Sequence, residues 1–231
     1  MAGVVLVEPP VEPPLSQAVR ALANLDSASV AEAVWIRLMG DAEAFGLPAL
    51  HPQEERVAIF VQVYEYGDNG QVNRNLRQAC VSLLDQHKET VYGEDLSQRW
   101  ALGEVCYLSA RIQSLNALKP LLEIAFLSRH FNTGERESFL RRVLGSLIGI
   151  LGSVRGGGPG NVEQATRIFE ECLELENCRL LALTGLIGLW PERRSEYLGR
   201  VPINEEDLDV NLTLAGFLPL ETLEARWPKV R

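Results

Sequence analysis

The amino-acid sequence predicts an all-α protein, folded as a right-handed α-solenoid of about four helix pairs with atypical caps at its ends. Three observations favour this fold. Strand-like patterns are scarce after Leu15, apolar residues recur at helical spacing through most of the chain, and the expected helices begin at regular intervals. A globular bundle of several helices remains the alternative, because it would show the same helical spacing.

The first fourteen residues are expected to lie outside the helical body. They read MAGVVLVEPPVEPP and include Pro9, Pro10, Pro13 and Pro14. Proline lacks the backbone N–H that a helix interior or a central strand needs, so residues 1–14 are predicted to form an extended, proline-rich arm. Such an arm either docks on a partner or on the body of the protein, or it is a loosely ordered terminus.

Helical periodicity is clearest in residues 71–88, where apolar side chains fall on one helix face and polar side chains on the other. Residues 94–112 are apolar around more of their circumference, so this helix is expected to lie deeper, and residues 115–127 are nearly all apolar. Three further helices are expected at residues 135–151, 161–175 and 177–190.

Two local signals accompany the later helices. Glycine is costly inside a helix, so Gly145, Gly149 and Gly152 predict that a neighbouring helix approaches closely there. Asn161 stands where the N-cap of the following helix is expected.

The expected helix starts are spaced at a nearly constant interval. Outer helices are placed near residues 28, 72, 115 and 161, and inner helices near residues 54, 94, 135 and 177. An interval of 40 to 46 residues is typical of two-helix solenoid repeats, in which stacking buries faces that one helix pair would leave exposed.

Two segments inside these repeats resemble a known family. NALKPLLEIAFL, at residues 116–127, resembles the first helix of a HEAT repeat, and RESFLRRVLGSLIGIL, at residues 136–151, is similar to the second. The resemblance to HEAT and armadillo-like repeats covers about residues 27–190 and implies a solenoid that binds other proteins. The family favours an arginine and then a small residue early in its second helix, and the matching pairs here are Arg56 with Ala58, Arg99 with Ala101 and Arg179 with Ala182.

The third repeat departs from that pattern. Arg141 and Arg142 are followed by Val143, and the first small residue is Gly145. The arginine series is expected to tie adjacent repeats together through acids and helix ends rather than to bind an anion. Its members are Arg56, Arg99, Arg142 and Arg179.

Acidic side chains exceed basic ones, and the formal net charge is −9. Nucleic-acid-binding proteins normally carry a basic excess, so nucleic acid is not an expected partner. Residues 15–200 are predicted to form the helical-repeat domain. Residues 201–231, with six acids and three bases, are predicted to form an acidic C-terminal cap or tail.

Neither a metal nor a cofactor is expected. The four cysteines, Cys80, Cys106, Cys172 and Cys178, form no C-x-x-C pair, and the three histidines are scattered. Free buried thiols are typical of a reducing compartment, and no signal peptide is visible, so the cytoplasm is the expected location.

The most distinctive local sequence is the glycine-rich segment Gly152–Asn161. Such a segment before a helix can bind phosphate, but this one lacks the Lys and Ser or Thr of a P-loop, so a flexible loop between repeats is predicted. A run of glutamates is predicted to be a charged surface rather than a catalytic pair; it comprises Glu170, Glu171, Glu174 and Glu176. No catalytic residue is assigned.

Four tryptophans complete the set of candidate residues. Trp35, Trp100 and Trp190 lie within or beside apolar segments and are expected in the core. Trp227 belongs to the ARWPKVR tail, where an exposed aromatic side chain would suit a partner-binding anchor.

These observations favour a non-enzymatic scaffold or adaptor that binds another protein or a peptide. One alternative is a HEAT-like protein that processes DNA bases, which would need Arg99, Arg142 and Arg179 on one concave face. The other is membrane insertion by the apolar residues 143–154 and 180–190, which fall short of a bilayer span.

Overall fold

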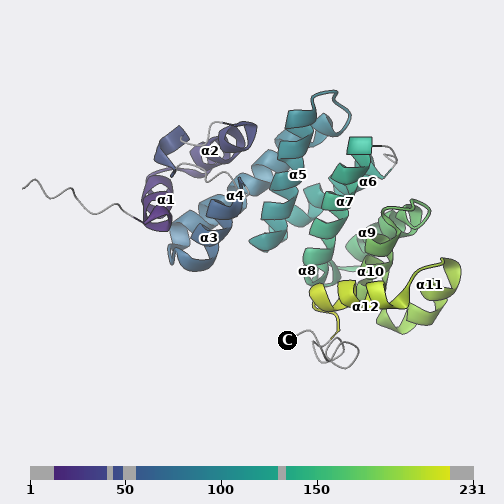
Figure 1. Ribbon diagram of the computed structural model, residues 1–231. Helices are drawn as coiled ribbons and strands as arrows, with labels where there is room; N and C mark the ends of the chain where they lie inside the picture. The colour runs from purple at the N-terminus through teal and green to yellow at the C-terminus, as the bar shows by residue number, and fades with distance from the viewer. Residues whose placement is uncertain (1–12, 41–43, 49–55, 130–133, 219–231) are drawn as a thin grey trace, which may run out of the picture.

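The computed structural model shows an all-helical protein, as predicted (Figure 1). It describes residues 13–40, 44–48, 56–129 and 134–218. These residues form twelve α-helices and four short 3₁₀ helices and contain no strand. Residues 1–12 of the predicted arm and residues 219–231 of the predicted tail lie outside the described residues.

The α-helices follow one another with short connections. They are α1 (Pro14–Ala23), α2 (Ser27–Met39), α3 (Ala58–Tyr66), α4 (Gly70–His87), α5 (Leu96–Arg111), α6 (Leu118–Ser128), α7 (Gly134–Gly149), α8 (Leu151–Gly156), α9 (Pro159–Cys172), α10 (Arg179–Leu189), α11 (Arg194–Arg200) and α12 (Glu205–Leu214). The 3₁₀ helices are η1 (Ala44–Gly46), η2 (Lys88–Val91), η3 (Leu115–Ala117) and η4 (Pro191–Arg193).

Four helices begin at a polar N-cap. The side chains of Asp26, Asn69, Asp95 and Asn204 each accept hydrogen bonds from backbone N–H groups of the first helical turn. These N–H groups have no partner within the helix, so the caps fix where α2, α4, α5 and α12 start.

Helices that pack together are close in the chain sequence. One series of contacts runs from α2 to α4, α6 and α9, and a second runs from α3 to α5, α7 and α10. Contacts of α4 with α5, α6 with α7 and α9 with α10 join the two series. In Figure 1 the helices accordingly succeed one another along an elongated body, from α1 at one end to α11 and α12 at the other.

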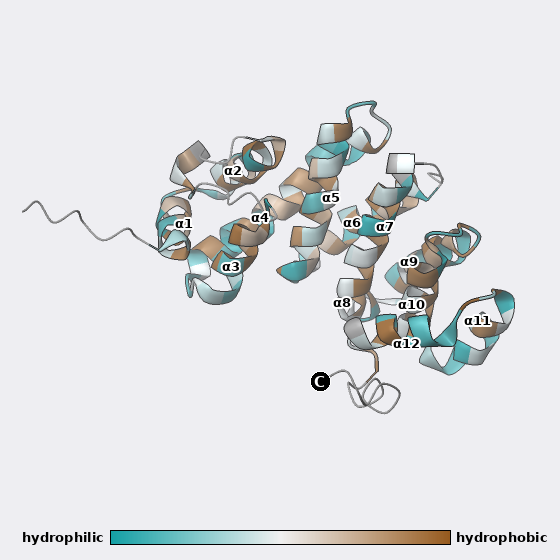
Figure 2. Ribbon diagram, in the orientation of Figure 1, coloured by the Kyte–Doolittle hydropathy of each residue, from teal (hydrophilic) through white to brown (hydrophobic). Residues whose placement is uncertain are grey.

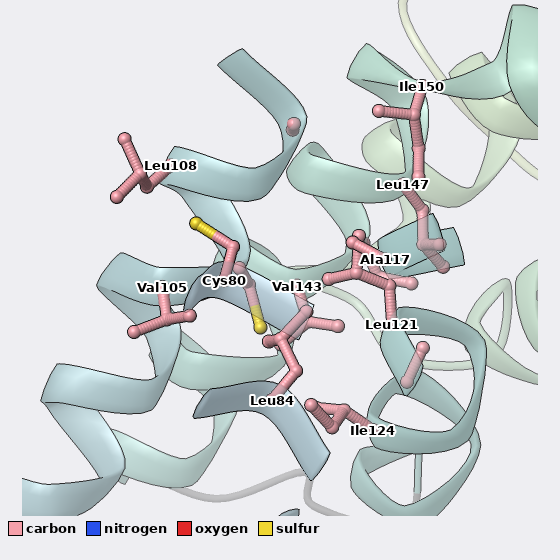
Figure 3. Close-up of a cluster of buried hydrophobic side chains, with 14 of the residues drawn as sticks. Cys80, Leu84, Val105, Leu108, Ala117, Leu121, Ile124, Val143, Leu147 and Ile150 are labelled. Carbon is pink, nitrogen blue, oxygen red and sulfur yellow. The ribbon is translucent and has the colours of Figure 1, made fainter. Parts of the chain in front are cut away.

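A continuous apolar core runs through this body. Figure 3 shows one part of it, where side chains from α4, α5, α6 and α7 meet. Cys80, Val105, Leu121 and Val143 contribute from these four helices, and each is fully buried. Along the ribbon, hydrophobic and hydrophilic residues alternate around most helices (Figure 2).

Three local predictions are wrong. Pro14 was assigned to the extended arm but is the first residue of α1, because the first helical position needs no N–H partner. The segment Gly152–Asn161 is mostly helical rather than a loop, since only Gly157 and Gly158 separate α8 from α9. Asn161 therefore lies inside α9, and the N-cap is Gly158 at a φ of 98°.

The glycines that accept close neighbours also differ from the prediction. A Cβ built on Gly145 or Gly152 would meet nothing within 4 Å, and one on Gly149 would make only an ordinary contact at 3.5 Å. Two glycines of α10 have much closer neighbours. A Cβ on Gly185 would lie 2.4 Å from the ring of Phe169, and one on Gly188 would lie 2.6 Å from a ring carbon of Phe217.

Candidate functional site

A cleft of about 630 Å³ is lined by residues of α5, α7 and α10. Its apolar lining side chains are Leu96, Trp100, Phe139 and Leu181. Its charged lining side chains are Arg99, Arg141 and Arg142, with no acidic residue in the described part of the lining. We call this space, with these seven side chains, the α5–α7 cleft.

Exposed apolar side chains lie at the start of α5 and just before it. Tyr92, Leu96 and Trp100 are 53 %, 50 % and 44 % exposed. Leu96 and Trp100 are four residues apart and therefore lie on one side of α5, whereas Tyr92 belongs to the connection before the helix. Asp95 fixes the start of α5 by accepting hydrogen bonds from Ser97 N and Gln98 N. Large apolar side chains are therefore presented beside the cleft.

Arg99 is buried at the cleft, with only 3 % of its surface exposed. Its Nη2 donates a hydrogen bond to the carbonyl oxygen of Gly93, which holds the side chain against the connection before α5. Its Nε has no acceptor among the described residues. The guanidinium is thus held in place with one N–H group unsatisfied.

Arg142 joins α7 to α5. It forms an ion pair with Glu104, whose side chain is 3 % exposed, and its guanidinium lies over the ring of Tyr107 at 4.8 Å from the centroid. Its Nε also has no acceptor in the described parts of the chain. The neighbouring Arg141 is exposed.

Close packing forms the wall between α5 and α7. A Cβ on Gly103 would lie 3.3 Å from the ring of Phe139, so the absence of a side chain at this position lets the ring lie close to α5. Arg56 covers Trp100 from another side, with its guanidinium carbon 5.0 Å from the ring centroid, and donates a hydrogen bond to the carbonyl oxygen of Leu38. The cleft is therefore built by side chains that neighbouring elements hold in place.

The predicted role of the arginine series is confirmed in part. Arg142 joins two neighbouring helices through Glu104, and Arg56 bonds the end of α2. Arg99 and Arg179 instead bond carbonyl oxygens shortly before their own helices, at Gly93 and Leu173. The structure brings Arg99 and Arg142 to one cleft and leaves Arg179 outside its lining.

Two of the predicted surface glutamates take part in contacts between elements. Glu171 of α9 forms ion pairs with Arg129 and Arg167, and Glu170 forms one with Arg200 of α11. The pKa of Glu171 is lowered by these two arginines against the opposing effect of burial. These two carboxylates thus form ion pairs on a charged surface, in agreement with the prediction.

The expected tryptophan positions need one correction. Trp35 and Trp190 pack partly buried against the core, and the indole N–H of Trp190 donates to Thr166 at 2.9 Å. Trp100 was expected in the core but is 44 % exposed. Trp227 lies outside the described residues.

Reasoning from the sequence therefore missed the α5–α7 cleft. The recurrence of Tyr92, Leu96 and Trp100 every four residues was a visible signal. It could not be distinguished from a buried face, because which side of α5 is covered depends on α4 and α7.

The described residues offer little for nucleophilic or metal chemistry. Burial raises the pKa of the Cys80 and Cys172 thiols to about 12 and that of Cys178 to about 11. Thiols of such pKa remain protonated at neutral pH and are poor nucleophiles. The described residues include no group of three or more potential metal ligands, and none of their helices is long and apolar enough to span a membrane.

Comparisons with protein-family models, with curated proteins and with solved structures return no match for this chain.

Proposed function

We propose that this protein is a non-enzymatic interaction scaffold that binds another protein or a peptide at the α5–α7 cleft. The observation that carries this proposal is the exposure of Leu96 and Trp100 in the lining of a cleft whose other side chains are held by neighbouring elements. Ligand sites of this kind are concave and mostly apolar, with a few placed polar groups. Tryptophan and arginine are also the residues most enriched among the energetically dominant contacts of interfaces.

The proposed architecture is a right-handed solenoid of HEAT-like helix pairs. The two series of packed helices support it, because in stacked repeats each helix contacts the equivalent helix of the next pair. In this arrangement α3, α5, α7 and α10 form the inner row that carries the cleft. The packing of α12 against α10 supports a role for residues 201–231 as a C-terminal cap.

The proposed location is a reducing compartment such as the cytoplasm. All four cysteines are free and buried in the structure. Two of them, Cys80 and Cys106, lie on the packed helices α4 and α5 and are free thiols. Disulfides are rare in cytosolic proteins, where thiols are kept reduced.

Site-specific crosslinking tests the proposed function. The photoreactive residue p-benzoylphenylalanine would replace Trp100 in the full chain, which is expressed in its native host and irradiated. The matched control carries the same residue in place of Tyr66, which is 69 % exposed and does not line the cleft.

The expected result is a discrete protein adduct of stoichiometric yield at position 100 and none at position 66. Equal adducts at both positions, or a retained small molecule in place of a protein, would overturn the proposal.

One observation favours a second candidate, a nucleic-acid-binding protein. Arg99, Arg141 and Arg142 meet at one cleft beside an exposed tryptophan, and arginine with aromatic stacking is how single strands are held. Against this stands the net charge of −9. Binding of a dT₂₀ oligonucleotide with an affinity that falls steeply with salt would favour this candidate.

A further inference from the structure

We infer that the α5–α7 cleft recognises an acidic peptide segment, in which a carboxylate lies next to an aromatic or aliphatic side chain. This inference rests on the proposed function and adds the chemistry of the partner. Its basis is a set of guanidinium groups that are fixed in the cleft wall and that keep N–H donors without an acceptor among the described residues.

Two N–H donors in the cleft wall have no acceptor among the described residues. Arg99 is almost wholly buried, and its Nε has no acceptor within the described residues, as is also true of the Nε of Arg142. Buried donors are nearly always hydrogen-bonded, so these two N–H groups require an acceptor. Both residues line the cleft, so a ligand bound there lies beside these two guanidinium groups.

The charged residues that line the described part of the cleft are all basic. Three arginines and no acidic residue line the described part of the cleft, whereas the protein as a whole carries a net charge of −9. Glu104 already compensates the charge of Arg142. Arg99 and Arg141 still leave the described lining positive, and a positive cleft attracts an anionic group locally. A long polyanion such as nucleic acid would also meet the excess of acidic side chains elsewhere on the protein, whereas a short acidic peptide contacts the cleft alone.

A carboxylate is the anion that suits the arginines of the cleft. Arg142 already binds the carboxylate of Glu104, which shows that its position in the wall suits a carboxylate. Arginine binds carboxylates through paired N–H donors. When the guanidinium is already immobilised, the arginine side chain loses less conformational entropy as the anion binds. Arg99 is immobilised by Gly93 and Arg142 by Glu104 and Tyr107.

The apolar part of the cleft suits a hydrophobic side chain next to the acidic residue of the ligand. Leu96, Trp100, Phe139 and Leu181 supply apolar walls within the same cleft of about 630 Å³. A volume of this size is within the range of pockets that enclose drug-sized ligands, which corresponds to a few side chains of a peptide. The acidic residue of the ligand is therefore accompanied by an aromatic or aliphatic residue that fills the apolar part.

A selection from random dodecapeptides displayed on phage tests this inference, with the full chain immobilised as the target. The expected result is enrichment of peptides with net negative charge that carry an aromatic or aliphatic residue beside Asp or Glu. The enriched peptide is then synthesised, and its Kd is measured by fluorescence anisotropy against wild type and three variants.

Arg99→Lys keeps the charge but removes the Nε–H donor, and we expect about a tenfold weaker Kd, the usual effect of losing one charge-assisted hydrogen bond. Arg141→Gln removes an exposed charge of the lining, and we expect about a threefold weaker Kd. The matched control is Arg74→Gln on α4, an exposed arginine outside the cleft, for which the change should stay below twofold. Thermal unfolding of each variant identifies any loss of fold, and Arg141→Gln tests the inference by itself if Arg99→Lys unfolds.

The remaining outcomes separate this inference from the proposed function. Enriched peptides without acidic residues, or an acidic peptide that binds wild type and Arg141→Gln equally, would overturn the inference and leave a peptide-binding scaffold standing. Absence of any enriched peptide would overturn both. Displacement of the acidic peptide by dT₂₀ at lower concentration than by unlabelled peptide would replace the peptide with nucleic acid.

Discussion

Arginine side chains form several of the ion pairs that join neighbouring helices of this protein. Arg142 bonds Glu104 across α5 and α7, Arg129 bonds Glu171 across α6 and α9, and Arg194 bonds the buried Asp209 of α12. Arginine suits these contacts because its planar group forms several hydrogen bonds at once. Most basic residues of the chain are arginine, in agreement with such a use.

The buried ion pair of Arg142 gives a prediction for stability. Arg142→Met leaves the carboxylate of Glu104, which is 3 % exposed, without this cation. Loss of one partner of a buried pair is strongly destabilising, and because Arg142 itself is 34 % exposed we expect a reduced effect of about 2 kcal/mol in the free energy of unfolding. Urea denaturation measures this value. Arg141→Met, one position away on the exposed side of α7, should change it by less than about 0.5 kcal/mol.

A second pair of side chains gives a prediction for how stability depends on pH. The ring of His87, on α4, stacks on Trp35 of α2 with 3.6 Å between centroids and an interplanar angle of 8°. Burial lowers the pKa of His87 below its usual value near 6.5, because the charged form would lose hydration.

The sign of the pH effect follows from that shift. Since the unfolded chain binds a proton at His87 more readily than the folded one, this stabilising contribution is present above about pH 6.5 and is lost as pH falls through the folded-state pKa. We expect the melting temperature to fall more between pH 7.5 and pH 5.5 in wild type than in His87→Phe, which keeps an aromatic ring. Equal pH profiles for the two proteins would contradict the assignment.

Helix α10 shows how glycine sets the distance between elements. Gly185 lies under the ring of Phe169 from α9, and Gly188 lies under Phe217 and Leu151. The sequence pattern drew attention to Gly145 and Gly149 of α7 because glycine is unfavourable in any helix, but only the packing partner shows which glycines are needed.

Two alanine substitutions should therefore act in opposite directions. Gly185→Ala places a methyl group 2.4 Å from the Phe169 ring, and we expect a loss of about 2 kcal/mol in unfolding free energy from overpacking. Gly145→Ala, in a helix with nothing within 4 Å, should gain about 0.5–1 kcal/mol from helix propensity. Denaturant titration of the two variants gives both values, and a loss in both would show that α7 has a close neighbour at Gly145.

The ends of the helices were predictable where a cap is local. The pattern at residues 71–88 corresponds to α4, Gly70–His87, whose start is set by Asn69 one residue before the helix. The start of α9 was misplaced at Asn161, because Pro159 at the first position of the helix and Gly158 at positive φ determine the start instead.

The molecule as a whole is an elongated succession of helices with contacts mainly between near neighbours (Figure 1). In such an array the central helices are covered on two sides and the terminal ones on one side. Opening from the ends therefore costs less free energy than opening at the centre.

Hydrogen exchange measures this difference. We expect amide protons of α5, α7 and α10 to exchange slowest and those of α1 and α11 to exchange fastest, with α4 close to the central group. Uniform protection across all these helices would indicate one cooperative globular bundle, the alternative that the sequence left open.

Local sequence information sufficed for the all-α class and for the approximate place of most helices, because periodicity and caps act within a few residues of each other. It did not suffice for the α5–α7 cleft. Trp100 is exposed, Gly185 lies under the Phe169 ring and Arg142 meets Glu104 because of how the helices pack on one another. A helical pattern shows which side chains share a face, whereas only the packing of neighbouring helices decides which face stays open to a partner.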